Sequence, residues 1–98
     1  MAYVIVANWR AREGEQERVE EILRTLAPLC EAEPACRMFV PQRSTGEARS
    51  FLLYEQYDDQ AGFEAHRETE HFKRYVLDEA VPLLEHRASE RYVTLENS

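Results

Sequence analysis

The segment of residues 2–10 constrains the fold most, because it has the pattern of a strand that is apolar on both faces. β-Branched and aromatic residues dominate it, and successive side chains of a strand point to opposite faces. One face would carry Tyr3, Ile5, Ala7 and Trp9, and the other Val4, Val6 and Asn8. A strand of this kind needs cover on both faces of its sheet.

The next part of the chain predicts a helix followed by a β-hairpin. Apolar residues recur at helical spacing over residues 19–30, and this helix should bend or end near Pro28. Strands are predicted over Cys36–Arg43 and Ser50–Tyr57, and the second has the strongest alternation in the chain. The polar turn at residues 44–47 should join them as a hairpin.

The C-terminal part predicts two further helical segments and a strand. Asp58 or Asp59 can cap a second helix, and Pro82 should open a short helical turn after the next helical segment. His86 is expected near the end of that third segment, where the helix dipole favours a cation. The last strand is predicted over roughly residues 90–95.

The resulting order of strand, helix, strand, strand, helix and strand is that of an α+β, ferredoxin-like split βαβ fold. It implies a four-stranded antiparallel sheet with helices on one face. A chain of 98 residues has no second helical layer for the other face, so we expect a homodimer that pairs two sheets as a dimeric α+β barrel. Because no repeat or linker divides residues 1–98, a single domain is predicted.

The charge balance limits the classes of partner that the chain is expected to bind. With 19 acidic and 12 basic residues, the formal net charge is −7, and such a field repels phosphate backbones and anionic lipid surfaces. We therefore expect no nucleic acid and no membrane partner. Met1 leads directly into the first strand, without the basic and apolar regions of a signal peptide, which favours a cytoplasmic location.

Two stretches resemble a known family. Residues 54–72 read YEQYDDQAGFEAHRETEHF. They resemble the signature of the antibiotic-biosynthesis-monooxygenase family, in which a strand ending in Glu and an aromatic residue leads into a helix with a His and a second His five residues later. The matching positions are Glu55, Tyr57, His66 and His71. Residues 33–36 resemble the Glu-Pro-Gly-Cys turn of the family, with Ala35 in place of Gly.

This resemblance implies a monooxygenase that needs no cofactor and oxidises a quinol or polyketide-like phenol with O2. His66 would be the base, since histidine titrates nearest to neutral pH, and His71 or Glu55 would orient it or bind a hydroxyl. Asn8 would hold a carbonyl or oxyanion. The other predicted substrate contacts are Phe39, Tyr57, Phe63 and Phe72.

The same residues also have a structural interpretation. His66 could be a packed side chain bonded to a backbone carbonyl or to Glu70, and Glu55 either pairs with a histidine or lies at an exposed edge. His66 and His71 can face one site only if the helix breaks near Thr69. The alternative function is therefore a non-catalytic or isomerase-type domain that binds a small metabolite.

Metal and haem chemistry find little support in the sequence. The two histidines lack the spacing of four residues found in helical metal sites, and no third ligand is evident, so no metal site is predicted. Related haem-degrading domains use a Trp where this chain has His66, and an axial His where it has Val76. Cys30 and Cys36 have neither a redox spacing nor a disulfide pattern, which predicts free buried thiols.

Overall fold

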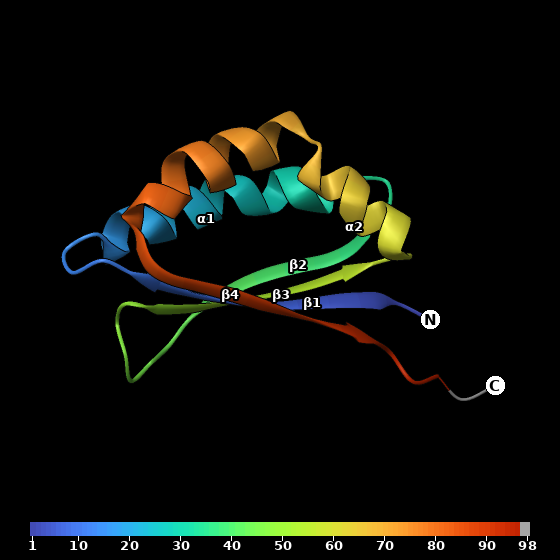
Figure 1. Cartoon of the computed structure of the whole chain (residues 1–98), viewed down its shortest axis with the longest axis horizontal. Coiled ribbons are helices and arrows are strands. Elements are labelled where there is room, and N and C mark those ends of the chain that lie inside the picture. Colours follow the sequence, from blue (N-terminus) through green and yellow to red (C-terminus); the bar gives the residue numbers. More distant parts are fainter. Residues whose placement is uncertain (97–98) are drawn as a thin grey trace.

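A four-stranded antiparallel sheet with helices on one face is the framework of the molecule (Figure 1). The structure, a computed structural model, describes residues 1–96. The strands are β1 (Tyr3–Ala11), β2 (Cys36–Arg43), β3 (Ser50–Tyr57) and β4 (Leu84–Val93), in the order β2-β3-β1-β4. The helices are α1 (Gln16–Glu31), α2 (Gln60–Arg67), the π-helical η1 (Phe72–Ala80) and the short 3-10 helix η2 (Val81–Leu83). The predicted ferredoxin-like fold and its element order are confirmed.

The core lies between the sheet and α1. Register places Trp9 opposite Phe51 and Ala7 opposite Leu53, so alternate side chains of β1 and β3 point toward the helices. They pack against the buried face of α1, which consists of Val19, Ile22, Leu23, Leu26 and Cys30. The next pair in the same row is Ile5 and Glu55, so the core face of the sheet continues into a buried carboxylate.

α1 includes Pro28 and ends at Glu31, one residue beyond the end near Cys30 that the sequence predicts and three residues after the proline. Pro28 has no N–H to give to the preceding turn. Leu26 and Cys30 on either side of it are nevertheless fully buried, so packing holds the last turn in helical form. The backbone N–H of Ala32 then bonds the Pro28 carbonyl, 3.2 Å away, and the helix ends just before Glu33.

α2 is held against the turn that carries Glu33. The Asp59 side chain caps the helix by accepting the Gly62 N–H at 2.8 Å. A Cβ atom on Gly62 would lie 2.7 Å from the Cβ of Ala35, so glycine permits a close approach between the helix and the turn. After α2, the Thr69 hydroxyl donates to the His66 carbonyl and accepts the Phe72 N–H. The helix is interrupted between Arg67 and Phe72, which meets the condition for His66 and His71 to face one site.

β4 is longer than predicted, and His86 lies in it rather than at a helix end. The strand begins at Leu84, and its pairing with β1 aligns His86 with Arg10 and Arg87 with Trp9. β4 is an edge strand in which every residue after Leu84 is exposed. β4 is therefore a strand because its backbone pairs with β1, and its sequence lacks the hydrophobic alternation of a half-buried strand.

No described segment covers the sheet face away from the helices (Figure 1). Register places apolar side chains on this face together with the polar Asn8, Gln56 and Glu90. We call this surface the open face. Register aligns Val40, Tyr54 and Val6 across it. Val40, Met38 and Tyr92 are exposed there, while Val6, Leu52 and Tyr54 are half-buried.

Among residues 1–96, no helix has the length and apolar character needed to cross a bilayer.

Candidate active site

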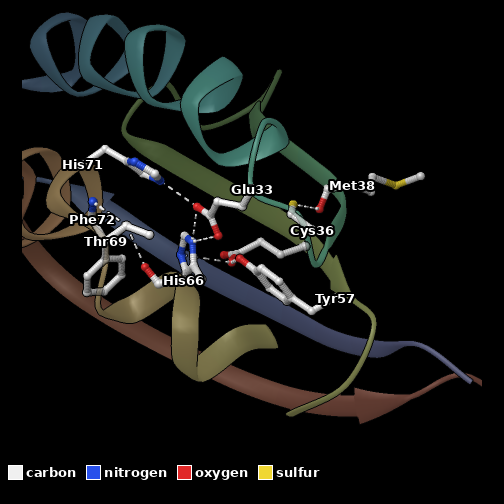
Figure 2. Close-up of polar contacts among 9 residues, drawn as sticks. Glu33, Cys36, Met38, Tyr57, His66, Thr69, His71 and Phe72 are labelled. Atoms are coloured by element: carbon white, nitrogen blue, oxygen red, sulfur yellow. Dashed lines mark hydrogen bonds and ion pairs between the residues drawn. The ribbon is translucent and has the colours of Figure 1, made fainter. Parts of the chain in front are cut away.

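Glu33, in the turn between α1 and β2, joins two imidazole rings (Figure 2). Its Oε2 atom lies 2.9 Å from Nδ1 of His66 and 2.6 Å from Nε2 of His71, and its Oε1 atom lies 3.2 Å from Nδ1 of His66. The histidines are 33 and 38 positions away along the chain. The break at Thr69 lets both of them reach the same carboxylate.

The hydrogen bonds define the tautomer of His66. Burial acts to raise the pKa of Glu33, but the hydrogen bonds from His66 and His71 outweigh it and leave that pKa below its usual value. An ionised carboxylate can only accept hydrogen bonds, so Nδ1 of His66 and Nε2 of His71 carry the hydrogens. A neutral His66 then has its free lone pair on Nε2.

The Nε2 side of His66 faces a second buried carboxylate. Oε1 of Glu55 lies 3.8 Å from Nε2, and the Tyr57 hydroxyl donates to the same oxygen at 2.6 Å. Burial raises the pKa of Glu55, although the Tyr57 hydrogen bond opposes the shift. The sequence left two interpretations of Glu55 open, and the structure agrees with the one in which it is buried next to a histidine.

A cavity of about 280 Å³ opens beside these groups, close to the lower end of the roughly 300–1,000 Å³ typical of ligand sites. Four aromatic side chains line it, namely Trp9, Phe39, Phe63 and Phe72. His66 and Glu55 supply polar groups to its wall, although only 2% and 5% of their surfaces are exposed. The cavity therefore combines an apolar wall with a titratable pair shielded from water.

Most of the predicted site residues meet at this cavity, but three do not line it. His66, Glu55, Phe39, Phe63 and Phe72 are in its wall. His71 binds Glu33 outside the wall, and Tyr57 is fully buried behind Glu55. Asn8 is exposed on the opposite face of the sheet, because its side chain alternates with those of Ala7 and Trp9. The structure thus leaves Asn8 away from the cavity, where the sequence analysis expected it to hold a carbonyl or oxyanion of the substrate.

Glu33 and the three arginines of the cavity wall, which are Arg67 on α2 and two on β4, were absent from the predicted site. Glu33 lies in the turn that resembles the family motif, so its position was a usable signal, although nothing in the sequence linked it to His66. Arg87 and Arg91 line the cavity from β4. The sequence analysis placed residues 84–89 outside a strand, so the alternation that brings Arg87 and Arg91 to one face was not evident.

The cluster around Glu33 also has the atoms of a metal site. Ligand atoms of Cys30, Glu33, His66 and His71 lie within 4.8 Å of one another, and such a donor set would suit Zn²⁺. Glu33 and Cys30 are therefore the further candidate ligands that were not evident in the sequence. Burial raises the pKa of the Cys30 thiol far above its usual range, and Glu33 already pairs with both imidazoles. A cation would have to displace the thiol proton and both hydrogen bonds, so the cluster fits proton handling better.

Together, the fold and the cavity define an α+β domain with a cavity beside a buried histidine that is hydrogen-bonded to a carboxylate. Residues 2–77 match the family described as antibiotic biosynthesis monooxygenase, and the chain belongs to that family. The resemblance stated from the sequence is confirmed.

Solved structures agree with this assignment. Protein PA3566 from Pseudomonas aeruginosa is 27% identical with a TM-score of 0.91, over 97% of this chain and 95% of that chain. Protein SO0527 from Shewanella oneidensis is 26% identical with a TM-score of 0.87, over 93% and 88%. A structure described as an antibiotic biosynthesis monooxygenase is 22% identical, with a TM-score of 0.88 over 98% and 100%, and so shares the fold. No curated protein matches the chain significantly.

Proposed function

We propose that the chain is a monooxygenase that oxidises a quinol or polyketide-like phenol with O2 and needs neither metal nor flavin. The observation that supports this most is the arrangement of His66. Its Nδ1 atom is bonded to an ionised Glu33, and its Nε2 atom is on the side of Glu55 and the aromatic cavity. This is the geometry of a general base whose tautomer is fixed by a carboxylate.

In the proposed reaction, Nε2 of His66 accepts the proton of a ring hydroxyl. The resulting phenolate is electron-rich and gives one electron to O2, and the two radicals then combine into a carbon–oxygen bond. Cleavage of the O–O bond leaves one oxygen atom in the oxidised product, and the other leaves as water with two hydrogens from the substrate. Glu33, 2.9 Å from Nδ1, stabilises the imidazolium that forms when His66 takes the first proton.

The neighbouring groups have distinct parts in this proposal. Glu55 favours its neutral form because burial raises its pKa, so its carboxyl group can donate to a substrate oxygen. His71 holds the Glu33 carboxylate in position through a hydrogen bond of 2.6 Å. Phe39, Phe63 and Phe72 surround the His66 ring, with centroid distances between 5.1 and 6.1 Å, and exclude water from the base.

We also propose that the working assembly is a homodimer joined through the open face. Val40, Tyr54 and Val6 form an apolar row on it that ends at Glu90 on β4. Met38 and Tyr92, both exposed, stand at the two ends of the neighbouring row. Such a patch is costly to leave in water, and a two-fold pairing with a second copy would bury it on both chains.

The test is O2 consumption with a panel of naphthoquinols. His66→Gln keeps most of the volume of the ring but cannot accept a proton at neutral pH, so turnover should fall by about 100-fold or more. His86→Gln is the matched control, because His86 is exposed on β4 and is not in the cavity wall. A chelator such as EDTA should leave the wild-type rate unchanged.

Two outcomes would contradict the proposal. Full turnover in His66→Gln would show that His66 is not the base. Loss of turnover on chelation, with recovery on adding Zn²⁺, would make the Cys30, Glu33, His66 and His71 cluster a metal centre, and Cys30→Ser should then abolish recovery while Cys36→Ser should not. If ligands bind but no quinol consumes O2, the domain is a metabolite-binding protein.

A further inference from the structure

The cavity has an unusual charge for this protein. The chain carries a formal net charge of −7, but three arginines line the cavity, namely Arg67, Arg87 and Arg91, against one acidic residue, Glu55. With three guanidinium groups against one carboxyl group, the wall of the cavity has a net positive charge whether Glu55 is ionised or neutral. The cavity wall is therefore positively charged, whereas the chain as a whole is negatively charged.

The two arginines of β4 are placed to act on a bound molecule. Register sets Arg87 beside Trp9 and Arg91 beside Ile5, and both of these β1 residues line the cavity. The Arg91 guanidinium lies 5.1 Å from the centroid of the Phe63 ring, which belongs to the opposite wall on α2. Arg87 is also close enough for its charge to act against the rise in the pKa of Glu55. The positive charge therefore reaches the same space as the aromatic wall and the buried carboxyl group.

Arg87 and Arg91 also lack the carboxylate partner that most arginines of the described chain have. The third cavity arginine, Arg67, lies 3.8 Å from Glu64, and Arg12 bonds only the Pro82 carbonyl. Arg10, Arg18, Arg24, Arg37, Arg43, Arg49 and Arg74 each lie within 4.0 Å of a carboxylate oxygen. Within the described part of the chain, Arg91 bonds only the Tyr3 hydroxyl, at 3.3 Å, and Arg87 has no ion pair or hydrogen bond. In a chain rich in acidic residues, two arginines without a carboxylate at one cavity leave charge for a ligand to neutralise.

We propose that this cavity selects aromatic molecules that carry an anionic oxygen group, which Arg87 and Arg91 bind from β4. The ring would lie among the aromatic side chains with its hydroxyl toward His66. The inference rests on the proposed function for the identity of the ring hydroxyl, whereas the anion site rests on the arginines alone. Carboxylate and phosphate share this chemistry, because both accept paired hydrogen bonds from a guanidinium group.

Binding can be measured without turnover, because Trp9 is the one tryptophan in the sequence and lines the cavity. Its fluorescence, supported by calorimetry, gives dissociation constants for naphthol, hydroxynaphthoate and naphthyl phosphate. The wild type should bind at least one anionic probe about 10-fold or more tightly than naphthol, since charge-assisted hydrogen bonds exceed neutral ones. The preferred anion identifies the group as carboxylate or phosphate.

Variants distinguish a specific anion site from nonspecific electrostatic attraction between the protein and an anionic probe. Arg87→Gln and Arg91→Gln should each reduce the preference, and together they should bring the anionic and neutral probes to about equal affinity. Arg24→Gln is the control, because Arg24 is an exposed arginine of α1 that does not line this cavity. Equal affinity of the wild type for all three probes would overturn the inference, as would a preference that survives in the double variant.

The outcome is independent of the oxygenase test. If no quinol consumes O2 but the anionic preference depends on Arg87 and Arg91, the anion site stands and the proposed reaction fails. If His66-dependent oxidation occurs with equal affinity for neutral and anionic probes, the reaction stands and the anion site fails.

Discussion

At the scale of single residues, the contact between Glu33 and His66 is the one on which the proposed chemistry most depends. The carboxylate holds the hydrogen on Nδ1 and leaves Nε2 free. Glu33→Gln replaces it with an amide whose NH2 group can donate to Nδ1, which would favour the tautomer with the hydrogen on Nε2. We expect kcat to fall by about 100-fold or more.

Glu31→Gln is the control for this measurement, since Glu31 is exposed at the end of α1. Thermal unfolding of both variants should accompany the kinetics, because an unfolded variant would also be inactive. A well-folded Glu33→Gln protein with the wild-type rate would show that the tautomer does not limit the reaction.

Glu55 predicts how stability depends on pH. Its pKa in the folded chain is raised by burial, so folding favours the protonated form. The resulting stabilisation is fully present below the unfolded-state pKa, about 4.3, and is lost as the pH rises through the folded-state pKa. Glu55→Gln removes this titration and keeps an oxygen that can accept the Tyr57 hydrogen bond.

We therefore expect the melting temperature of Glu55→Gln to rise relative to wild type between about pH 4 and about pH 8. Glu64→Gln serves as the control, because Glu64 is exposed on α2. Melting curves that keep a constant difference across this range would contradict the raised pKa.

At the scale of elements, the approach of α2 to the turn after α1 brings His66 to Glu33. Gly62→Ala would place a Cβ atom 2.7 Å from that of Ala35. Alanine is favoured over glycine in a helix by about 1 kcal/mol, so a free surface helix would gain stability. We expect instead a loss of about 1–3 kcal/mol from the clash, with weaker activity as α2 moves away.

Gly46→Ala is the matched control, since an added Cβ atom there meets nothing within 4 Å. Chemical denaturation gives both free energies of unfolding. A Gly62→Ala protein as stable as wild type would mean that the turn and the helix separate at no cost, and the position of Glu33 would then need another explanation.

At the scale of the whole molecule, the open face predicts dissociation on substitution. Sedimentation of the wild type should give about twice the chain mass. Val40→Lys places a charge at the β2 end of the apolar row and should shift the protein toward the monomer. Leu77→Lys is the control, because Leu77 is similarly exposed but lies on η1, away from the open face. A wild-type monomer would rule out the proposed assembly.

The sequence by itself determined the order of the elements. A strand or helix that buries one face must repeat its apolar residues at the period of that element, and this local pattern is visible in β1, β3 and α1. It also identified His66 and His71, and the condition that the helix must break near Thr69 for both to face one site. The aromatic residues Phe39, Phe63 and Phe72 were expected at the cavity and line it.

Only the tertiary structure decided which side chains meet. Glu33 pairs with His66 and His71 across 33 and 38 positions, and no local pattern encodes a contact of that separation. The sequence assigned Asn8 to one face of β1 and Trp9 to the other, but which face the helices cover depends on packing. β4 extends back to Leu84 because pairing with β1 satisfies its backbone, and this pairing brings Arg87 and Arg91 to the cavity. Local periodicity reports burial within one element, whereas a site is formed by contacts between elements.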